Sequence, residues 1–80
     1  MKTKTRQSHY RIRVKGRLDR SWSEQLGGMS IENLETNGEP MSVLSGPLAD
    51  QSALSGVIAA LVDMRHEVLS VDRLDAVRTE

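Results

Sequence analysis

One stretch of this chain has the spacing of an amphipathic α-helix, and it constrains the fold more than any other feature. Its apolar residues recur every three or four positions, at Leu54, Val57, Ile58 and Leu61. Asp50 stands where an N-cap residue is expected. We therefore predict a helix over about residues 51–64. A chain of 80 residues with one main helix has to build the rest of its core from strands.

The first strand is indicated by strict alternation from Tyr10 to Leu18. Apolar side chains would point to one face and basic side chains to the other: Tyr10, Ile12, Val14 and Leu18 against Arg11, Arg13, Lys15 and Arg17. A period of two with β-branched residues is typical of a strand with one buried and one solvated face. We predict that this strand lies over the core with its cations in water.

Shorter signals predict three further strands. They are expected at residues 29–35, at about 41–45 and at 68–73. Asn37-Gly38 is the strongest hairpin signal in the chain and would join the first two of these strands. Gly46-Pro47 is expected to stop the strand before the helix, because proline cannot donate a hydrogen bond to a neighbouring strand. Both residues of this dipeptide are thus predicted to be structural.

Residues 19–28 interrupt the strands and are expected to form one or two helical turns. Ser21 and Glu24 have the spacing of a capping box, in which each side chain binds the backbone N–H of the other residue. Trp22 is expected to lie over the edge of the core in a structural role. Gly27-Gly28 would end the turn.

The elements follow the order strand, short helix, strand, strand, helix, strand. We predict an α+β fold, a two-layer sandwich in which one main helix covers a four-stranded sheet. If residues 19–28 form a true crossover, the topology is ferredoxin-like. If they only bend back, strands one to three form an antiparallel meander, and the helix carries the fourth strand in parallel. Ten residues are near the lower limit for a crossover, which slightly favours the meander.

Charge is distributed unevenly along the chain, although the formal net charge is zero. Residues 1–20 carry a charge of +7, and residues 21–80 carry −7. We expect a flexible basic arm at 1–8, one domain at 9–74 and a tail at 75–80. Either the basic strand pairs with acidic residues within the fold, or it serves a polyanionic partner. An overall neutral domain has little long-range attraction for a polyanion, which favours the first alternative.

Several classes of protein are disfavoured by composition. The chain has no cysteine, which excludes disulfides and thiolate metal sites and suits a reducing cytoplasm. Its longest apolar stretch, residues 57–62, is far shorter than the ~20 residues that span a bilayer. The basic N-terminus is followed by no apolar stretch, so neither a signal peptide nor membrane association is expected.

No catalytic, metal or cofactor site is expected. His9 and His66 have no second ligand at the spacing that zinc sites use. Serines such as Ser45 and Ser55 lie in no nucleophile motif, and no pair of acids stands out. A helix N-terminus follows Gly46-Pro47, but the Asp50 cap would repel an anion there. We therefore predict that the chain is not an enzyme.

Two surfaces remain as candidates for binding. The basic row Arg11, Arg13, Lys15 and Arg17, extended by Lys2, Lys4 and Arg6, could follow a phosphate backbone. Single-strand binders also use aromatic stacking, however, and the only aromatic residues are Tyr10, on the buried side of its strand, and Trp22. Glu32, and also Asp72, are candidates to neutralise the row as cross-strand partners. Nucleic-acid binding is therefore the alternative hypothesis.

The favoured surface is the helix. It is apolar nearly all round between Val57 and Val62, whereas packing on its own sheet needs only a stripe about 100° wide. Ala59, Ala60 and Val62 would then face outward. We predict that they bind a protein partner and that this partner is a second copy, in a homodimer.

The chain also resembles a family of small uncharacterised prokaryotic proteins. The resemblance rests on Y-R-I-R-V-K-G-R-L-D from Tyr10, on Trp22, and on L-S-G-P-L-A-D-Q-S-A-L from Leu44, with L-S-V near the end. It covers about residues 10–74, and G-P-x-x-D-Q-x-A-L is its most specific part. No activity is established for this family, so the resemblance implies the same fold and a prokaryotic origin but supplies no mechanism.

Overall fold

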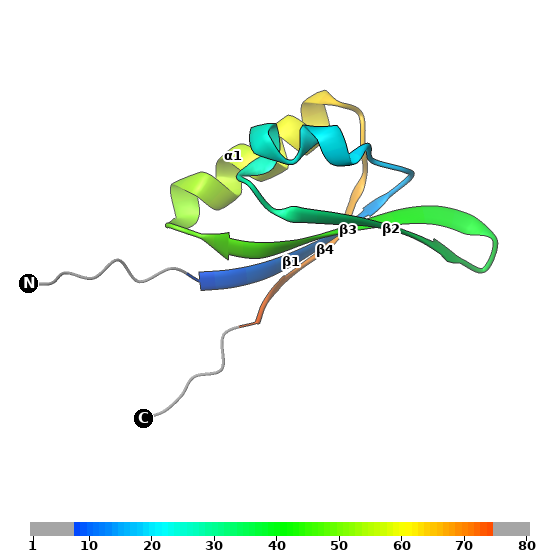
Figure 1. Cartoon of the computed structure of the whole chain (residues 1–80), viewed down its shortest axis with the longest axis horizontal. Coiled ribbons are helices and arrows are strands. Elements are labelled where there is room, and N and C mark those ends of the chain that lie inside the picture. Colours follow the sequence, from blue (N-terminus) through cyan, green and yellow to red (C-terminus); the bar gives the residue numbers. More distant parts are fainter. Residues whose placement is uncertain (1–7, 75–80) are drawn as a thin grey trace, which may run out of the picture.

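Four strands, two short 3-10 turns and one helix make up residues 8–74, the part of the chain that the structure, a computed structural model, describes (Figure 1). The elements are β1 Ser8–Lys15, η1 Arg20–Trp22, η2 Glu24–Leu26, β2 Ser30–Thr36, β3 Glu39–Leu48, α1 Gln51–Asp63 and β4 Val68–Arg73. The basic arm and the tail expected at the two ends of the chain lie outside these residues, apart from Ser8. The predicted α+β fold, with one main helix on a four-stranded sheet, is confirmed.

The strands follow the order β2-β3-β1-β4, and every neighbouring pair is antiparallel. This is the ferredoxin-like arrangement with its first helix reduced to two 3-10 turns. The expected meander is wrong, because β3 lies between β1 and β2. The short connection suffices because a 3-10 helix rises ~2 Å per residue, against 1.5 Å for an α-helix.

The first connection is held to the sheet by Asn33. Its side-chain amide donates to the carbonyl of Leu18 at 3.0 Å, and its Oδ1 accepts from the Leu18 N–H at 3.0 Å. The buried hydroxyl of Ser42 lies 2.7 Å from the same Oδ1 and 2.8 Å from the carbonyl oxygen of Gly16. The Asn33 side chain thus makes the two backbone hydrogen bonds that a neighbouring strand would otherwise make with Leu18.

The core lies between one face of the sheet and the layer formed by α1, η1 and η2 (Figure 1). Alternate residues of the strands and one stripe of α1 meet there. Its buried members are Tyr10, Ile12, Val14, Leu18, Leu26, Met29, Ile31, Leu44, Leu48, Val57 and Leu61. Ala53, Leu54, Ala60, Met64 and Val68 are partly buried against them.

Three local predictions are wrong. The first strand ends at Lys15, because Gly16 turns the chain with a φ of +95°, and Leu18 reaches the core from the connection instead. The expected capping box does not form. Asp19 caps η1 by accepting a hydrogen bond from the N–H of Ser21 at 2.9 Å.

Gly46 and Pro47 lie within β3 and do not end it. Since β2 begins at Ser30, which pairs with Ser45, the last residues of β3 have a strand neighbour only on the β1 side. Proline is tolerated at such an edge position. Gly46 is required for a different reason, because its φ is +152°, a backbone conformation that residues with a side chain rarely adopt.

The remaining turns match their predictions. Asn37 and Gly38 both have positive φ, 54° and 81°, as a two-residue hairpin loop requires. Asp50 caps α1 by accepting a hydrogen bond from the Ala53 N–H at 2.9 Å. The helix ends one residue before the predicted limit, and β4 has the predicted bounds.

Candidate partner-binding face

One face of the sheet has no helix over it in the described part of the chain, since α1, η1 and η2 all lie on the other face (Figure 1). We call it the uncovered face, and the strand registers define its residues. They include Arg11, Arg13 and Lys15 on β1, Met41, Val43 and Ser45 on β3, Ser30, Glu32 and Leu34 on β2, and Ser70 and Asp72 on β4.

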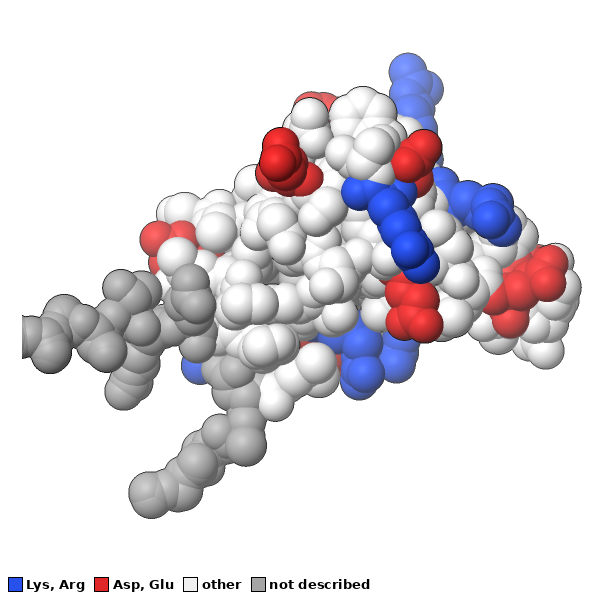
Figure 2. Space-filling view, viewed as in Figure 1, with Lys and Arg blue, Asp and Glu red and all other residues white. Residues whose placement is uncertain are grey.

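The basic row predicted from alternation lies on this face. Arg11, Arg13 and Lys15 run along β1, which is one of the two central strands. Figure 2 shows basic side chains below the sheet, on the side away from α1, and others near the 3-10 turns, with acidic side chains at the end where the β2–β3 hairpin turns. Arg17 does not belong to the row, because it follows the Gly16 turn and lines a separate hollow beside Asp19.

The row is only partly neutralised within the described residues. Arg13 forms an ion pair with Asp72 on β4 at 3.8 Å, with about two-fifths of each side chain exposed. Exposed pairs of this kind contribute only about 0–1 kcal/mol to stability. The predicted cross-strand pairing with Glu32 is wrong, because β3 separates β2 from β1.

Two polar atoms on this face are buried without a hydrogen-bond partner, namely Arg11 Nε and Ser70 Oγ. Leaving a buried donor unpaired costs roughly 1–3 kcal/mol, so native proteins rarely do so without a reason. A guanidinium can only donate, so what the face lacks beside Arg11 is an acceptor.

Apolar side chains share the face with these charges. Met41 and Val43 are half-buried on β3, and Leu34 on β2 is 39% exposed. Leu69, at the start of β4 beside a register shift, is 49% exposed. Local sequence patterns assign no role to these residues, but the alternation of β1, continued onto β3, places Met41 and Val43 beside the cations.

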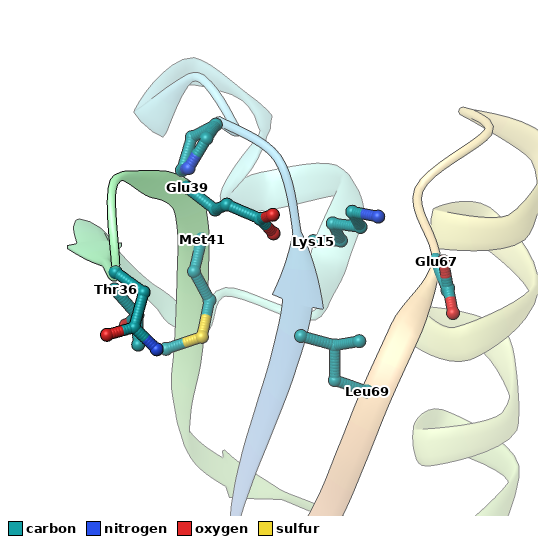
Figure 3. A pocket seen from close by; sticks show the side chains of 8 residues that line it. Lys15, Thr36, Glu39, Met41, Glu67 and Leu69 are labelled. Carbon is teal, nitrogen blue, oxygen red and sulfur yellow. The ribbon is translucent and has the colours of Figure 1, made fainter.

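Two shallow hollows mark the ends of the face. One, of about 350 Å³, has Met41 and Leu69 in its wall and Lys15, Glu39 and Glu67 around it (Figure 3). The other, of about 430 Å³, extends from Arg11 across Val43 to Glu32. Both combine an apolar wall with charges of opposite sign, which suits a protein surface better than a small apolar ligand.

The predicted surface on α1 is smaller than expected. Ala59 and Val62 are exposed, Val62 to 60%, but Ala60 packs against the core. The reason is helical spacing, since Ala60 follows the buried Val57 by three positions and therefore lies on the same stripe. Trp22, expected over the core edge, is 41% exposed and lies outside the buried core cluster.

Within residues 8–74, no three side chains of the types His, Asp or Glu gather as they would around a metal ion. His66 Nδ1 lies 3.1 Å from the carbonyl oxygen of Lys15, a contact that joins the end of β1 to the segment before β4. The pKa of Asp19 is lowered by the hydrogen bonds that its carboxylate accepts, first from the Ser21 N–H and then from the Ser21 hydroxyl. That carboxylate is the cap of η1.

Fold and surface together define a small α+β domain of ferredoxin-like arrangement with one sheet face left open. The chain belongs to the family described as a domain of unknown function, DUF8691, whose model matches residues 9–72. Comparison with curated proteins and with solved structures gives no match. The inferred resemblance to a family without an assigned activity is confirmed at that level. No helix in the described part of the chain is long and apolar enough to cross a membrane.

Proposed function

We propose that this chain is a non-enzymatic protein-binding domain that self-associates as a homodimer through the uncovered face. The observation that carries the proposal is the presence of half-buried apolar side chains on a sheet face that no helix of residues 8–74 covers. Met41, Val43 and Leu34 form a continuous apolar strip there, because Leu34 pairs with Met41 across the β2–β3 ladder. The lack of cysteine fits a reducing compartment, so we place this function in the cytoplasm.

Size also favours a partner. A domain of this length buries only about 60–65% of the surface that its unfolded chain exposes, so its own core is thin. Burying apolar surface contributes roughly 25 cal/mol per Å², and a second copy could cover the strip. The helix offers a smaller apolar surface, since its exposed apolar side chains are Ala59 and Val62, with Ile58 half-buried beside them.

Light scattering coupled to size exclusion tests this proposal. We expect the wild type to have twice the monomer mass of 8.9 kDa. Val43→Lys should return it to the monomer, because a lysine ammonium would be buried in the interface. If Val43→Lys unfolds, Leu34→Lys at a more exposed position of the same strip tests the same interface and should also give the monomer mass.

Val62→Lys is the matched control, since it adds the same charge to the exposed side of α1. A dimer that survives Val43→Lys and Leu34→Lys but dissociates with Val62→Lys would move the interface to the helix. A monomeric wild type at millimolar concentration would contradict self-association altogether.

Nucleic-acid binding is the second candidate, and the position of the basic row on an uncovered sheet face favours it. Single-stranded RNA binders of similar architecture stack bases on aromatic side chains of such a face. Here the two central strands present Arg11, Arg13 and Lys15 beside Met41 and Val43 on this face, and none of these side chains is aromatic. Glu32 and Asp72 also offset two of the three positive charges on the face.

Retention on single-stranded oligonucleotides at two salt concentrations tests this alternative. Three phosphate contacts would give a slope of about −2 in log K against log salt. Binding with such a slope, lost on Arg11→Glu, would favour nucleic acid over a protein partner. Absence of binding at low salt would exclude it.

A further inference from the structure

The strands on the two sides of β3 carry opposite charges on the uncovered face. Because the strand order is β2-β3-β1, β3 lies midway between the cations of β1 and the acid Glu32 of β2. Its own residues on this face are Met41 and Val43, followed by Ser45. The face therefore has an apolar centre, a basic side on which Asp72 of β4 offsets one of the three cations, and an acidic side.

We propose that two copies pack their uncovered faces together about a two-fold axis that follows β3. This inference rests on the proposed function and adds the identity and orientation of the partner. Such an axis exchanges the two sides of β3, so β1 of each copy lies over β2 of the other. β1 and β2 each lie about 4.8 Å from β3, so a rotation about β3 places each strand directly over the other strand of the second copy.

The strand registers give the contacts. Arg13 and Glu32 both pair with Val43, so they stand at the same height along β3. Rotation about this axis does not change the position of a residue along β3. Arg13 of one copy therefore lies over Glu32 of the second copy, and Arg13 of the second copy lies over Glu32 of the first. At the same level Val43 packs against its own counterpart. Facing sheets are about 10 Å apart, which long side chains from both sides fill.

Arg11 gains an acceptor for its Nε, which has none among residues 8–74. It pairs with Ser45, and so does Ser30 on β2, so the axis brings Arg11 over Ser30 of the second copy. Glu32 of the second copy is only two residues further along the same strand. A hydroxyl and a carboxylate thus lie within reach of the unpartnered Arg11 Nε.

Lys15 is accommodated differently. It and Leu34 both pair with Met41, so the aliphatic stem of Lys15 would cover Leu34 of the second copy. Figure 3 shows Lys15 between Glu39 and Glu67 of its own chain, at the rim of the face. Its ammonium can therefore stay at the solvated edge of the interface while the stem packs on apolar surface.

Charge reversal with complementation tests this arrangement. Arg13→Glu alone places two acids over each other at both symmetric contacts, and Glu32→Arg alone does the same with two cations. Each variant should raise the dissociation constant of the dimer by about 100-fold or more. An equimolar mixture of the two variants should form a heterodimer of twice 8.9 kDa, because each contact then joins opposite charges.

Controls separate the interface from general charge effects. Arg20→Glu and Glu24→Arg make the same charge changes on the exposed 3-10 turns, on the opposite side of the sheet, and should leave the dimer intact. Arg13→Glu also places a carboxylate beside Asp72 of its own chain. If that variant unfolds, Asp72→Asn is added to it, because this removes the like-charge pair within the chain and leaves the contact with Glu32 of the second copy unchanged.

The oligomeric state of the single variants and of their mixture decides between the alternatives. Restoration of the dimer only in the mixture supports the two-fold axis along β3. Monomeric single variants whose mixture stays monomeric would overturn this orientation, while Val43→Lys still tests the face independently. Single variants that remain dimeric would overturn it as well, and a monomeric wild type would overturn both the orientation and the proposed function.

Discussion

Asn33→Ala tests how the short first connection is held to the sheet. The substitution removes both hydrogen bonds to Leu18, each 3.0 Å long, and one of two oxygens within reach of the Ser42 hydroxyl. Leu18 is 2% exposed, so its backbone groups would find water only if the connection moves. Two lost bonds at about 1 kcal/mol each, with some penalty for buried unpaired groups, give a destabilisation of about 2–4 kcal/mol.

Urea denaturation followed by circular dichroism measures this difference as a shift of the midpoint at constant slope. In a domain of this size, each kcal/mol corresponds to about 4–8 °C in Tm, so a loss of about 2–4 kcal/mol should lower the melting temperature by at least about 8 °C. Glu35→Ala, at an exposed position of the same strand, should change stability by less than about 0.5 kcal/mol. An Asn33→Ala variant as stable as that control would show that the connection does not depend on this side chain.

Three smaller predictions concern the turns. Asp50→Ala should lower the free energy of unfolding by about 1 kcal/mol, read from the urea midpoint, because α1 loses its cap; an unchanged midpoint would contradict the capping role. Gly27→Ala should cost at least 1–2 kcal/mol in the same assay, since φ is +75° and the new Cβ would lie 2.8 Å from Leu48 Cδ2. The pKa of Asp19 should lie below its ordinary 3.8, because the bound carboxylate is stabilised by Ser21. Its contribution to stability is then present above the ordinary pKa and lost as pH falls through the lowered one, and an NMR titration giving 3.8 or more would refute this.

The elements that the sequence predicted well are those fixed by local chemistry. The Asn37-Gly38 turn needs positive φ at both positions, and Asp50 caps a helix whose apolar spacing is regular. These signals act within a few residues, so they do not depend on how the rest of the chain packs. The same holds for β4, which is bounded by the turn after α1.

What the sequence did not predict depends on contacts between distant residues. Local patterns predict that Pro47 ends the strand. It can lie within β3 because β2 begins only at Ser30, so no β2 residue is opposite Pro47 to need a backbone N–H there. The position of β3 between β1 and β2 likewise turned Glu32 from an expected neighbour of the cations into a residue two strands away. Local patterns do not specify strand order, so the sequence alone points to α1 as a partner surface and does not point to the sheet.

The uncovered face follows from the topology. The connection from β1 to β2 passes over β3, the connection from β3 to β4 passes over β1, and both lie on the same side of the sheet (Figure 1). Both connections lie on the same face of the sheet, so residues 8–74 contain no further element that could cover the opposite face. An entirely apolar uncovered face would aggregate with other apolar surfaces. An entirely charged face would bind a partner only weakly, because exposed ion pairs contribute little without apolar contact. Cations on one side of an apolar β3 and an acid on the other resolve this conflict, because only a partner with the reverse arrangement fits. A second copy turned about β3 has that arrangement.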